Sequence, residues 1–228
     1  MLVNGIIKSL EKKAIESYKR LGSYLDPNGG FTFDILKEPM VEEFEEIIGE
    51  KATLVAKIVL NTEENFPLKY TKKGELFKRQ REYYDPDNKE WDGRIIDYIE
   101  LHPLWTSIEN EWLYFLVYDG HIVKIGMTIT SLKDRAGSYN CGTRRAMEKG
   151  SCSTTNFIIS ECNAFAVQNG IEAEIYSISV SKEIKKVTRF GVTKECIYSV
   201  ARDAETMLTD AFIAAYGHKP VLCVQEGK

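Results

Sequence analysis

Apolar residues recur at helical spacing near both ends of the chain. Between residues 3 and 21 they return every three or four positions, and Gly22 follows where a glycine commonly ends a helix. Residues 202–216 repeat the pattern. We predict an amphipathic helix over each segment, and we place the apolar stripe of the second one, with Met207 and Phe212, in the core.

The middle of the chain changes to the alternating pattern of strands. Residues 112–118 and 121–127 predict two short strands joined as a hairpin, because Asp119 and Gly120 between them form a strong turn signal. Residues 53–60 fit either a strand or the end of a buried helix. Shorter patterns predict further elements: an acidic helix from Pro39 to about residue 48, helices over 131–139 and 153–169, and a strand over 171–180.

These elements predict an α+β fold. Its centre is a small antiparallel or mixed β-sheet, made of the hairpin and at least one further strand and flanked by helices. We predict a boundary near Pro103. A mostly helical or irregular N-terminal region would cover residues 1–105, and a compact unit would cover residues 106–228.

The register of the hairpin follows from its apolar residues. Those of the two strands should cover the same side of the sheet. They are Leu113, Phe115 and Val117 on the first strand and Val123, Ile125 and Met127 on the second. A three-residue loop, Tyr118 to Gly120 with Gly120 left-handed, brings the two sets together. Tyr114 then lies directly opposite Lys124 on the other, polar face.

A tyrosine hydroxyl beside a lysine ammonium has a chemical consequence. The positive charge favours the phenolate form, and burial favours the neutral amine, so either group can supply a base near neutral pH. The plainer alternative is an amphipathic cross-strand pair whose polar ends both lie in water.

Charge is unevenly distributed along the 228 residues, whose formal net charge is −4. Acidic residues concentrate in 34–50 and basic residues in 121–149 and 182–194, while 67–84 mixes bases with aromatic residues. Such segregation allows a positive groove on an acidic protein, and a polyanion responds to the local field more than to net charge. The plainer interpretation is that these runs are solvated faces.

Several classes of protein are excluded by the composition. The five cysteines lack the short paired spacing of zinc or redox sites and are expected to be reduced thiols, mostly buried. HExxH, P-loop and GxGxxG strings are absent from the sequence. No apolar stretch approaches the roughly 18 residues that span a bilayer, and the N-terminus does not read as a secretion signal. We expect a cytoplasmic protein with no membrane partner.

The hairpin also carries a sequence resemblance. Trp112-Leu113-Tyr114, followed by Lys124-Ile125-Gly126, resembles the two-part core of the GIY-YIG nucleases. Arg135 and Glu205 follow in the order of that family's arginine and metal-binding glutamate. The resemblance covers residues 111–220 and is closest to the branch of bacterial restriction endonucleases and phage endonucleases.

The resemblance implies a metal-dependent endonuclease that cuts double-stranded DNA, of the sequence-specific restriction or phage type. Tyr114 would be the general base or its hydrogen-bonded relay, helped by Lys124. Arg135 would bind the scissile phosphate, and Glu205 would hold one Mg²⁺ or Mn²⁺. The region 1–105 would serve DNA recognition or dimerisation, with a homodimer left open.

Some positions depart from the family pattern or stand outside it. Trp112 replaces a glycine, and Lys124 replaces a tyrosine, as in some members of that branch. His218 is the nearest polar candidate for the family's C-terminal asparagine. Arg144, Arg145 and His218 are candidates for DNA contact. The alternatives are solubility for the two arginines and interaction with a helix dipole for the histidine.

Two other functions stay open. A catalytically inactive DNA-binding module could keep the fold, but the matched Tyr114, Arg135 and Glu205 count against it. A non-nuclease, partner-binding protein could use the acidic segment 34–50.

Overall fold

A computed structural model describes residues 2–26, 29–61, 68–76, 84–85, 90–91 and 96–223 of the protein. The chain divides into two compact units: the first contains Met1–Phe33, Ile58–Ile99 and Ser138–Ala173, and the second contains Asp34–Lys57, Glu100–Gly137 and Glu174–Lys228. Each unit draws residues from both sides of residue 105, and the predicted domain division stays a prediction. None of the helices described is long and apolar enough to cross a membrane.

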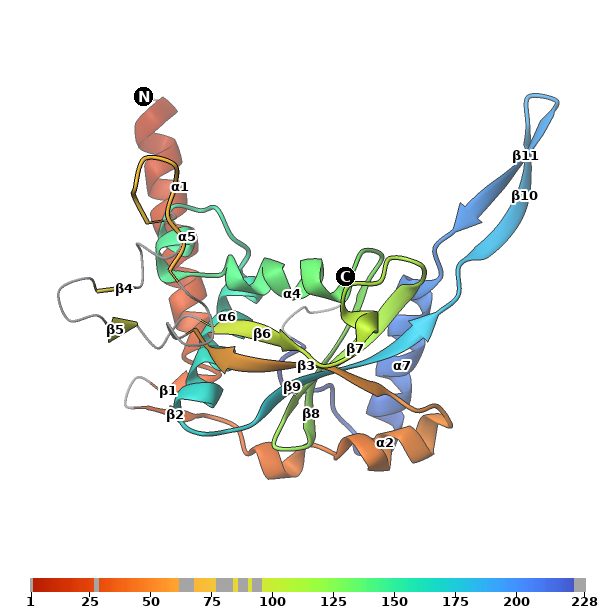
Figure 1. Ribbon diagram of the computed structural model, residues 1–228, viewed down its shortest axis with the longest axis horizontal. Helices are drawn as coiled ribbons and strands as arrows, with labels where there is room; N and C mark the ends of the chain where they lie inside the picture. The colour runs from red at the N-terminus through yellow and green to blue at the C-terminus, as the bar shows by residue number, and fades with distance from the viewer. Residues whose placement is uncertain are drawn as a thin grey trace. The chain divides into compact units, whose positions relative to one another are not determined.

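The fold is α+β, as predicted, with a mainly antiparallel main sheet of five strands. The strands lie in the order β6-β3-β9-β7-β8 (Figure 1). Their bounds are Thr53–Leu60 for β3, Ile96–Glu100 for β6, Glu111–Tyr118 for β7, His121–Thr128 for β8 and Ala173–Val180 for β9. Residues 53–60 therefore form a strand, and the N-terminal half supplies two strands of this sheet.

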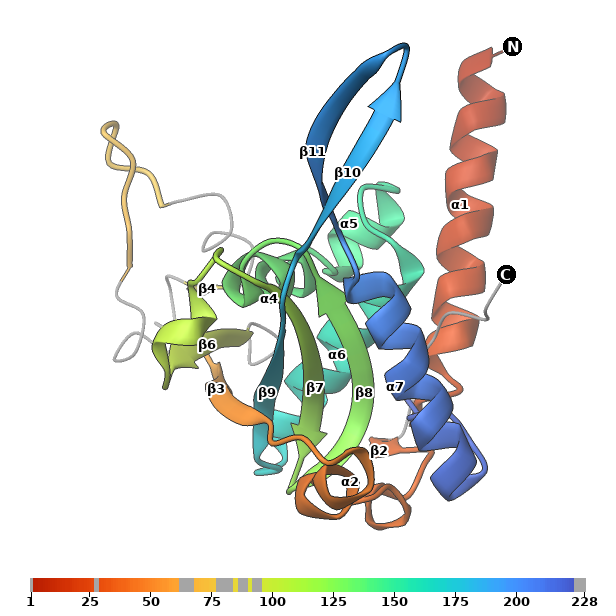
Figure 2. The same ribbon diagram turned by 90° about the vertical axis from the view of Figure 1, so that its right-hand side faces the viewer.

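In the second unit, helices α2 (Val41–Ile48) and α7 (Ala201–Tyr216) pack on one face of the β7–β8 hairpin (Figure 2). The ring centroid of Phe44 lies 5.3 Å from that of Phe212. Met207 was predicted to join this core and is instead 72% exposed, so that prediction is wrong. The buried stripe of α7 is narrower than the sequence pattern, because it centres on Leu208 and Phe212 and leaves Met207 to one side.

The hairpin turn contains two residues, where three were predicted. Tyr118 pairs with His121, and Asp119 and Gly120 between them have φ values of 46° and 85°. Two successive left-handed residues match the twist of the flanking strands, and aspartate followed by glycine is well suited to them. The left-handed conformation predicted for Gly120 is confirmed.

A β-bulge on β8 then shifts the register. Val117 and Leu116 are neighbours, yet their partners Ile122 and Lys124 are two positions apart, so Val123 has no partner on β7. An extra residue of this kind changes the pairing of every residue beyond it.

Beyond the bulge, Tyr114 pairs with Gly126, and Lys124 lies diagonally across from Tyr114. The predicted direct pairing of Tyr114 with Lys124 is therefore wrong. The error amounts to two positions, and because side chains alternate with a period of two, both residues still share one face. The backbone N–H of Leu222 donates to the carbonyl of the bulged Val123 at 2.7 Å.

An antiparallel ribbon that the sequence pattern did not predict follows β9 in the chain and precedes α7. It consists of β10 (Glu183–Arg189) and β11 (Val192–Tyr198), paired only with each other among the strands described. Figure 1 shows it extending away from the ends of β9 and α7. The alternation of this segment carries no consistent apolar face, which explains why it gave no strand signal.

The first unit is largely helical. Helices α1 (Leu2–Leu21), α5 (Arg144–Glu148) and α6 (Thr154–Gln168) contact one another, and α4 (Leu132–Asn140) supplies residues to both units. The long predicted helices are thus confirmed to within one or two residues at their ends. The remaining short elements are β1 Leu25–Asp26, β2 Gly30–Phe31, η1 Ile35–Lys37, β4 Tyr84–Asp85, β5 Glu90–Trp91 and η2 Pro103–Trp105. In the basic and aromatic segment 67–84, residues 67 and 77–83 lie outside the described residues.

Candidate active site

Tyr114 and Arg135 are joined by a hydrogen bond within the second unit. Arg135, in the first turn of α4, donates its Nε–H to the phenolic oxygen of Tyr114 on β7 at 3.0 Å. Tyr114 is only 2% exposed and Arg135 is partly buried, so this bond is partly shielded from water. Hydrogen bonds are electrostatically stronger in such surroundings than in solvent.

The start of α4 fixes the backbone of Arg135. Ser131, directly before the helix, donates its hydroxyl to the Asp134 carboxylate at 2.8 Å and accepts the Asp134 N–H at 3.1 Å. The backbone N–H of Arg135 donates to the Ser131 carbonyl at 3.1 Å. These bonds satisfy first-turn N–H groups, as a serine N-cap does. The arginine therefore extends from a rigid helix end.

Gly126 makes room for the phenol ring. A Cβ atom at this position would overlap the Cζ and Oη atoms of Tyr114, its cross-strand partner. Lys124, two residues earlier on the same face, is 7% exposed, and every residue of β7 is buried. The face was expected to be polar and half-exposed and is instead buried, because side chains on both faces of β7 are buried. The alternative in which both polar ends lie in water is excluded.

Glu205 lies in the second turn of α7 and is half-buried. Desolvation by burial raises the pKa of its carboxyl group above the ordinary value. The charges of Lys124, Arg135 and Arg202 and a backbone hydrogen bond from Met127 oppose this effect and lower the pKa. The carboxyl group therefore lies within electrostatic reach of three basic side chains.

The structure thus brings together four residues from four elements of the second unit. Arg135 connects the group, because it bonds Tyr114 and interacts with Glu205. We call this group the Tyr114 cluster: Tyr114 on β7, Lys124 on β8, Arg135 on α4 and Glu205 on α7. It combines a phenol, two cations and a carboxyl group, which suits the binding and hydrolysis of a phosphate ester.

Glu111, which no sequence motif marked, holds the start of α7 against β7. Its Oε2 atom accepts hydrogen bonds from the Ser199 hydroxyl at 3.0 Å, the Val200 N–H at 3.1 Å and the Ala201 N–H at 3.0 Å. A carboxylate here satisfies unpaired helix N–H groups and faces the positive end of the helix dipole. One signal was visible in the sequence: Val200, at the N-cap position, has no side-chain oxygen to cap the helix.

Glu205 is the carboxylate of the cluster that could hold a divalent cation. Within the described residues there is no group of three or more His, Cys, Asp or Glu side chains that could hold a metal, and the five cysteines are free thiols. Mg²⁺ is commonly held by one or two carboxylates, with water and substrate phosphate as its other ligands. Because burial disfavours the carboxylate form of Glu205, a nearby cation would stabilise that form.

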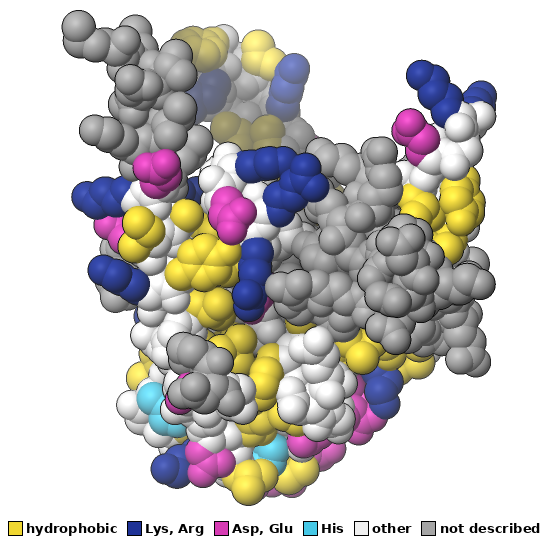
Figure 3. All heavy atoms as spheres, turned by 90° about the vertical axis from the view of Figure 1, so that its left-hand side faces the viewer, with side chains coloured by type: hydrophobic (Ala, Val, Ile, Leu, Met, Phe, Trp, Pro, Cys, Tyr) yellow, Lys and Arg dark blue, Asp and Glu magenta, His cyan; other side chains and the backbone are white. Residues whose placement is uncertain are grey.

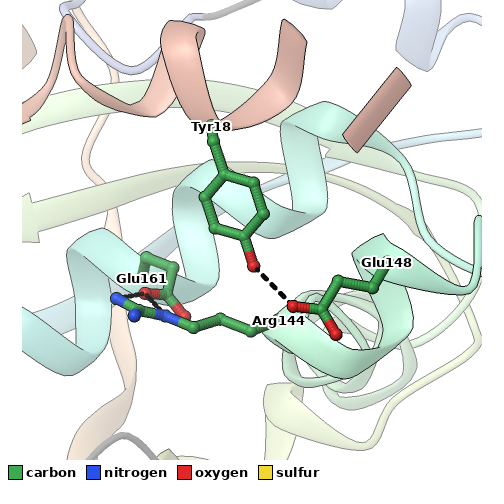
Figure 4. A network of polar contacts seen from close by, with 4 residues as sticks. All are labelled: Tyr18, Arg144, Glu148 and Glu161. Carbon is green, nitrogen blue, oxygen red and sulfur yellow. Dashed lines mark hydrogen bonds and ion pairs between the residues drawn. The ribbon is translucent and has the colours of Figure 1, made fainter. Parts of the chain in front are cut away.

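Arg144 has a structural role in the first unit (Figure 4). Its Nε and a terminal nitrogen donate to Glu161 at 2.9 and 2.8 Å, and the Glu161 side chain is buried. Tyr18 donates to Glu148 beside this pair at 3.3 Å.

Arg145 is exposed on the same short helix as Arg144. Among the side chains coloured in Figure 3, lysines and arginines lie in small groups with acidic and hydrophobic side chains between them. DNA contact by either arginine stays a prediction.

His218 lies beyond the C-terminus of α7, at the opposite end of that helix from Glu205. Its Nδ1 atom is 3.9 Å from the Glu38 carboxylate, and its ring stands edge-on to that of Phe212. The structure therefore does not bring His218 into the Tyr114 cluster, and its contact with DNA also stays a prediction.

The solved structures that are similar to this chain include two endonucleases. No protein-family model and no curated protein matches the chain. One structure is "Restriction endonuclease HPY188I in complex with product DNA", at 22% identity and a TM-score of 0.46, covering 85% of this chain and 90% of that one. The other is a single-site mutant of EndoII from bacteriophage T4, at 13% identity and a TM-score of 0.44, covering 78% of this chain and 96% of that one.

Proposed function

We propose that the protein is a metal-dependent endonuclease of the GIY-YIG type, which hydrolyses phosphodiester bonds of double-stranded DNA as restriction or phage endonucleases do. The observation that carries the proposal is the partly buried hydrogen bond between Tyr114 and Arg135, next to a carboxyl group that interacts with Lys124 and Arg135. A phenol, an arginine and an acid that converge from separate elements match the roles that hydrolysis of a phosphodiester requires.

Tyr114 and Lys124 would handle the proton of the attacking water. The N–H that Arg135 donates to the phenolic oxygen stabilises negative charge building there as a proton leaves. Lys124 shares the buried face with Tyr114 and would assist as proton acceptor or through its charge. General acid–base catalysis by placed groups of this kind contributes about 10²–10⁴-fold to a rate.

Arg135 and Glu205 would act on the phosphate. The fork of N–H groups on a guanidinium can hold the phenolic oxygen and a phosphate oxygen at once. Glu205 would hold the cation, with water and phosphate as the other ligands. A bound Mg²⁺ would supply Lewis-acid stabilisation of the leaving oxygen.

The test is cleavage of a supercoiled plasmid with Mg²⁺ or with EDTA. The wild-type protein should convert the plasmid to nicked or linear DNA only with the metal. Glu205→Gln should lower that rate by about a hundredfold or more, yet bind duplex DNA in Ca²⁺. Asp203→Asn, which removes an exposed acid from the same helix, is the matched control and should cut normally.

Two results would overturn the proposal. One is an absence of cleavage across Mg²⁺, Mn²⁺ and a wide range of DNA sequences. The other is cleavage that persists undiminished in Glu205→Gln and in Tyr114→Phe, since both changes remove a group to which the proposal gives a chemical role. Loss of DNA binding together with cleavage in Glu205→Gln would assign that residue to folding instead.

A further inference from the structure

The β10–β11 ribbon is the most exposed regular element among the described residues. Every residue of β10 is exposed, as are the described side chains of β11. Large apolar side chains share this exposure: Ile184, Val187, Phe190, Val192 and Tyr198. A two-stranded ribbon on its own is marginally stable in water, so such a surface is well suited to gain order from a partner.

The pairing register separates the ribbon into two faces of different charge. Cross-strand partners point to the same side, so the pair Glu183–Tyr198 and every second pair after it share one face. We call this the basic face; it contains Glu183, Lys185, Val187, Arg189, Val192, Lys194, Cys196 and Tyr198. Three bases there oppose one acid. On the other face Lys186 is balanced by Glu195, 3.8 Å away.

Positive charge on the basic face increases toward the turn. At the base of the ribbon, Lys185 lies 3.1 Å from the Glu183 carboxylate and 3.7 Å from the centre of the Tyr198 ring. The outer half, residues 187–194, contains Arg189 and Lys194 and no acidic residue. A polyanion would therefore meet the outer half of this face first.

The turn itself presents an aromatic residue in an unfavourable conformation. Phe190 has a φ of 54° and is 102% exposed, and Gly191 after it has a φ of 74°. Asparagine, aspartate or glycine is preferred at the first position of such a turn, because a bulky residue in the left-handed region is strained. Backbone strain of this kind is commonly kept where it serves a contact.

We propose that the basic face of the ribbon binds in the major groove of duplex DNA, with Phe190 at its leading end. The inference rests on the proposed function and names where that enzyme grips its substrate. Seven residues per strand give a ribbon of about 23 Å. A B-form major groove, about 12 Å wide, admits a two-stranded ribbon. Lys185, Arg189 and Lys194 would then face phosphates, which are the main source of affinity.

The link between the ribbon and the Tyr114 cluster is short. Only Ser199 and Val200 separate β11 from α7, and both are held by the Glu111 carboxylate. DNA bound along the ribbon would therefore lie on an element that leads directly into α7, the helix that carries Glu205. A second copy of this chain is the competing occupant, but the excess of bases on this face argues for a polyanion over a surface of the same charge.

The experiment measures duplex affinity across salt concentrations by fluorescence anisotropy, in the full chain with Ca²⁺ in place of Mg²⁺. Each phosphate contact contributes about 0.9 to the slope of log K against log salt. Lys194→Gln should lower the slope by about 0.9 and Arg189→Gln with Lys194→Gln by about 1.8. Lys186→Gln removes one charge from the other face and should leave the slope unchanged.

Phe190→Asn separates binding from folding. Asparagine suits the turn better, so the melting temperature should stay the same or rise. Duplex affinity should nevertheless fall several-fold, because the leading contact is lost. If Phe190 had a structural role instead, Phe190→Asn would lower the melting temperature and leave duplex affinity unchanged. With 5-bromouracil DNA, whose bromine lies in the major groove, photocrosslinks should map to residues 190–194.

The outcomes distinguish this inference from the proposed function. If the wild type binds and cuts duplex DNA while Lys194→Gln and Lys186→Gln have equal slopes, the ribbon proposal is wrong and the nuclease proposal stands. If ribbon variants change the sedimentation coefficient of the protein without changing its DNA affinity, a second copy of the chain occupies this surface. A wild type that binds no duplex overturns both proposals.

Discussion

At the scale of single residues, the phenol of Tyr114 depends on a neighbour that has no side chain. Its ring occupies the space where a Cβ atom at position 126 would stand, and its oxygen receives the Arg135 N–H. The small size of Gly126 therefore has a direct geometric consequence for the cluster, even though the residue carries no functional group.

Gly126→Ala should displace the phenol ring and break the bond to Arg135. We expect cleavage to fall by about a hundredfold, because misplacement of a reacting group by about 1 Å has effects of this size. The free energy of unfolding should fall by only about 1–3 kcal/mol, the usual cost of overpacking. Plasmid cleavage and urea denaturation measure the two effects. Gly137→Ala is the control, because open space surrounds that position, and equal activity losses in both variants would contradict the prediction.

Lys124→Met should preserve the fold and impair the reaction. Methionine replaces the buried aliphatic stem with similar volume. Cleavage should fall by about a hundredfold or more if Lys124 takes part in proton transfer. Because the charge of Lys124 lowers the pKa of Glu205, its removal should raise that pKa further and move the acidic limb of the pH–rate profile to higher pH. Single-turnover rates across pH test both effects. A wild-type rate with an unshifted profile would show that Lys124 has no part in the chemistry.

At the scale of the elements, α7 is positioned by a strand distant in the sequence. The three residues that donate hydrogen bonds to Glu111 follow it in the sequence by 88 to 90 positions. Glu111 itself stands three positions before Tyr114 on the same strand. The Glu111 carboxylate therefore fixes the start of α7, the helix that carries Glu205, against β7, the strand that carries Tyr114.

Glu111→Gln should weaken the attachment of α7 to β7. Hydrogen bonds to a charged group contribute about 1.5–3 kcal/mol, and a neutral amide keeps only part of that, so unfolding should become about 1–2 kcal/mol easier. Mn²⁺ binding measured by calorimetry should weaken as well, because Glu205 would be less well placed. Glu109→Gln, which changes an exposed glutamate two positions earlier, is the control. Unaltered metal affinity in a measurably destabilised Glu111→Gln would limit Glu111 to a structural role.

The elements show which features a sequence can reveal. Alternation along 112–118 and 121–127 was enough to assign faces, because burial depends on side-chain direction. It could not give the register, because Val123 is as apolar as a paired residue and nothing in the pattern marks it as bulged. The Glu111 contact is long-range and left only the poor cap at Val200 as a local sign.

At the scale of the whole molecule, the fold class and the convergence of the Tyr114 cluster could be predicted from the sequence. The arrangement of the chain into two units of three segments each could not be predicted, because the segments that form one unit are separated in the sequence by long segments of the other unit. The β10–β11 ribbon was also missed, since an element exposed on both faces leaves no hydrophobic period to detect.

Stability against pH should reveal the environment of Glu205. Its pKa is raised in the folded protein, mainly by desolvation, so its contribution to stability is present at low pH and is lost as pH rises through the folded pKa. Without metal, Glu205→Gln should therefore be more stable than the wild type near neutral pH, and the difference should vanish below about pH 4, where the carboxyl is protonated in both states.

Added Mg²⁺ should reverse this order. A cation bound by the carboxylate stabilises the folded wild type by mass action, whereas Glu205→Gln should respond weakly. Thermal unfolding from pH 4 to pH 8, with EDTA or with Mg²⁺, measures both effects. Asp210→Asn, an exposed change on the same helix, should follow the wild type throughout. Equal responses to Mg²⁺ in the wild type and Glu205→Gln would refute the assignment of Glu205 as the metal ligand.

The bulge at Val123 also affects how relatives of this chain can be recognised. The distance along the chain from Tyr114 to Lys124 includes one residue of β8, Val123, that has no partner on β7. A homologue that lost the bulge would keep the same two side chains on one face with the lysine one position nearer to the tyrosine. A one-residue gap at this point of an alignment would preserve the site, whereas the same gap within either strand would turn the lysine to the opposite face. Searches with a fixed tyrosine-to-lysine spacing would overlook such homologues, and allowing one optional residue at the bulge would recover them.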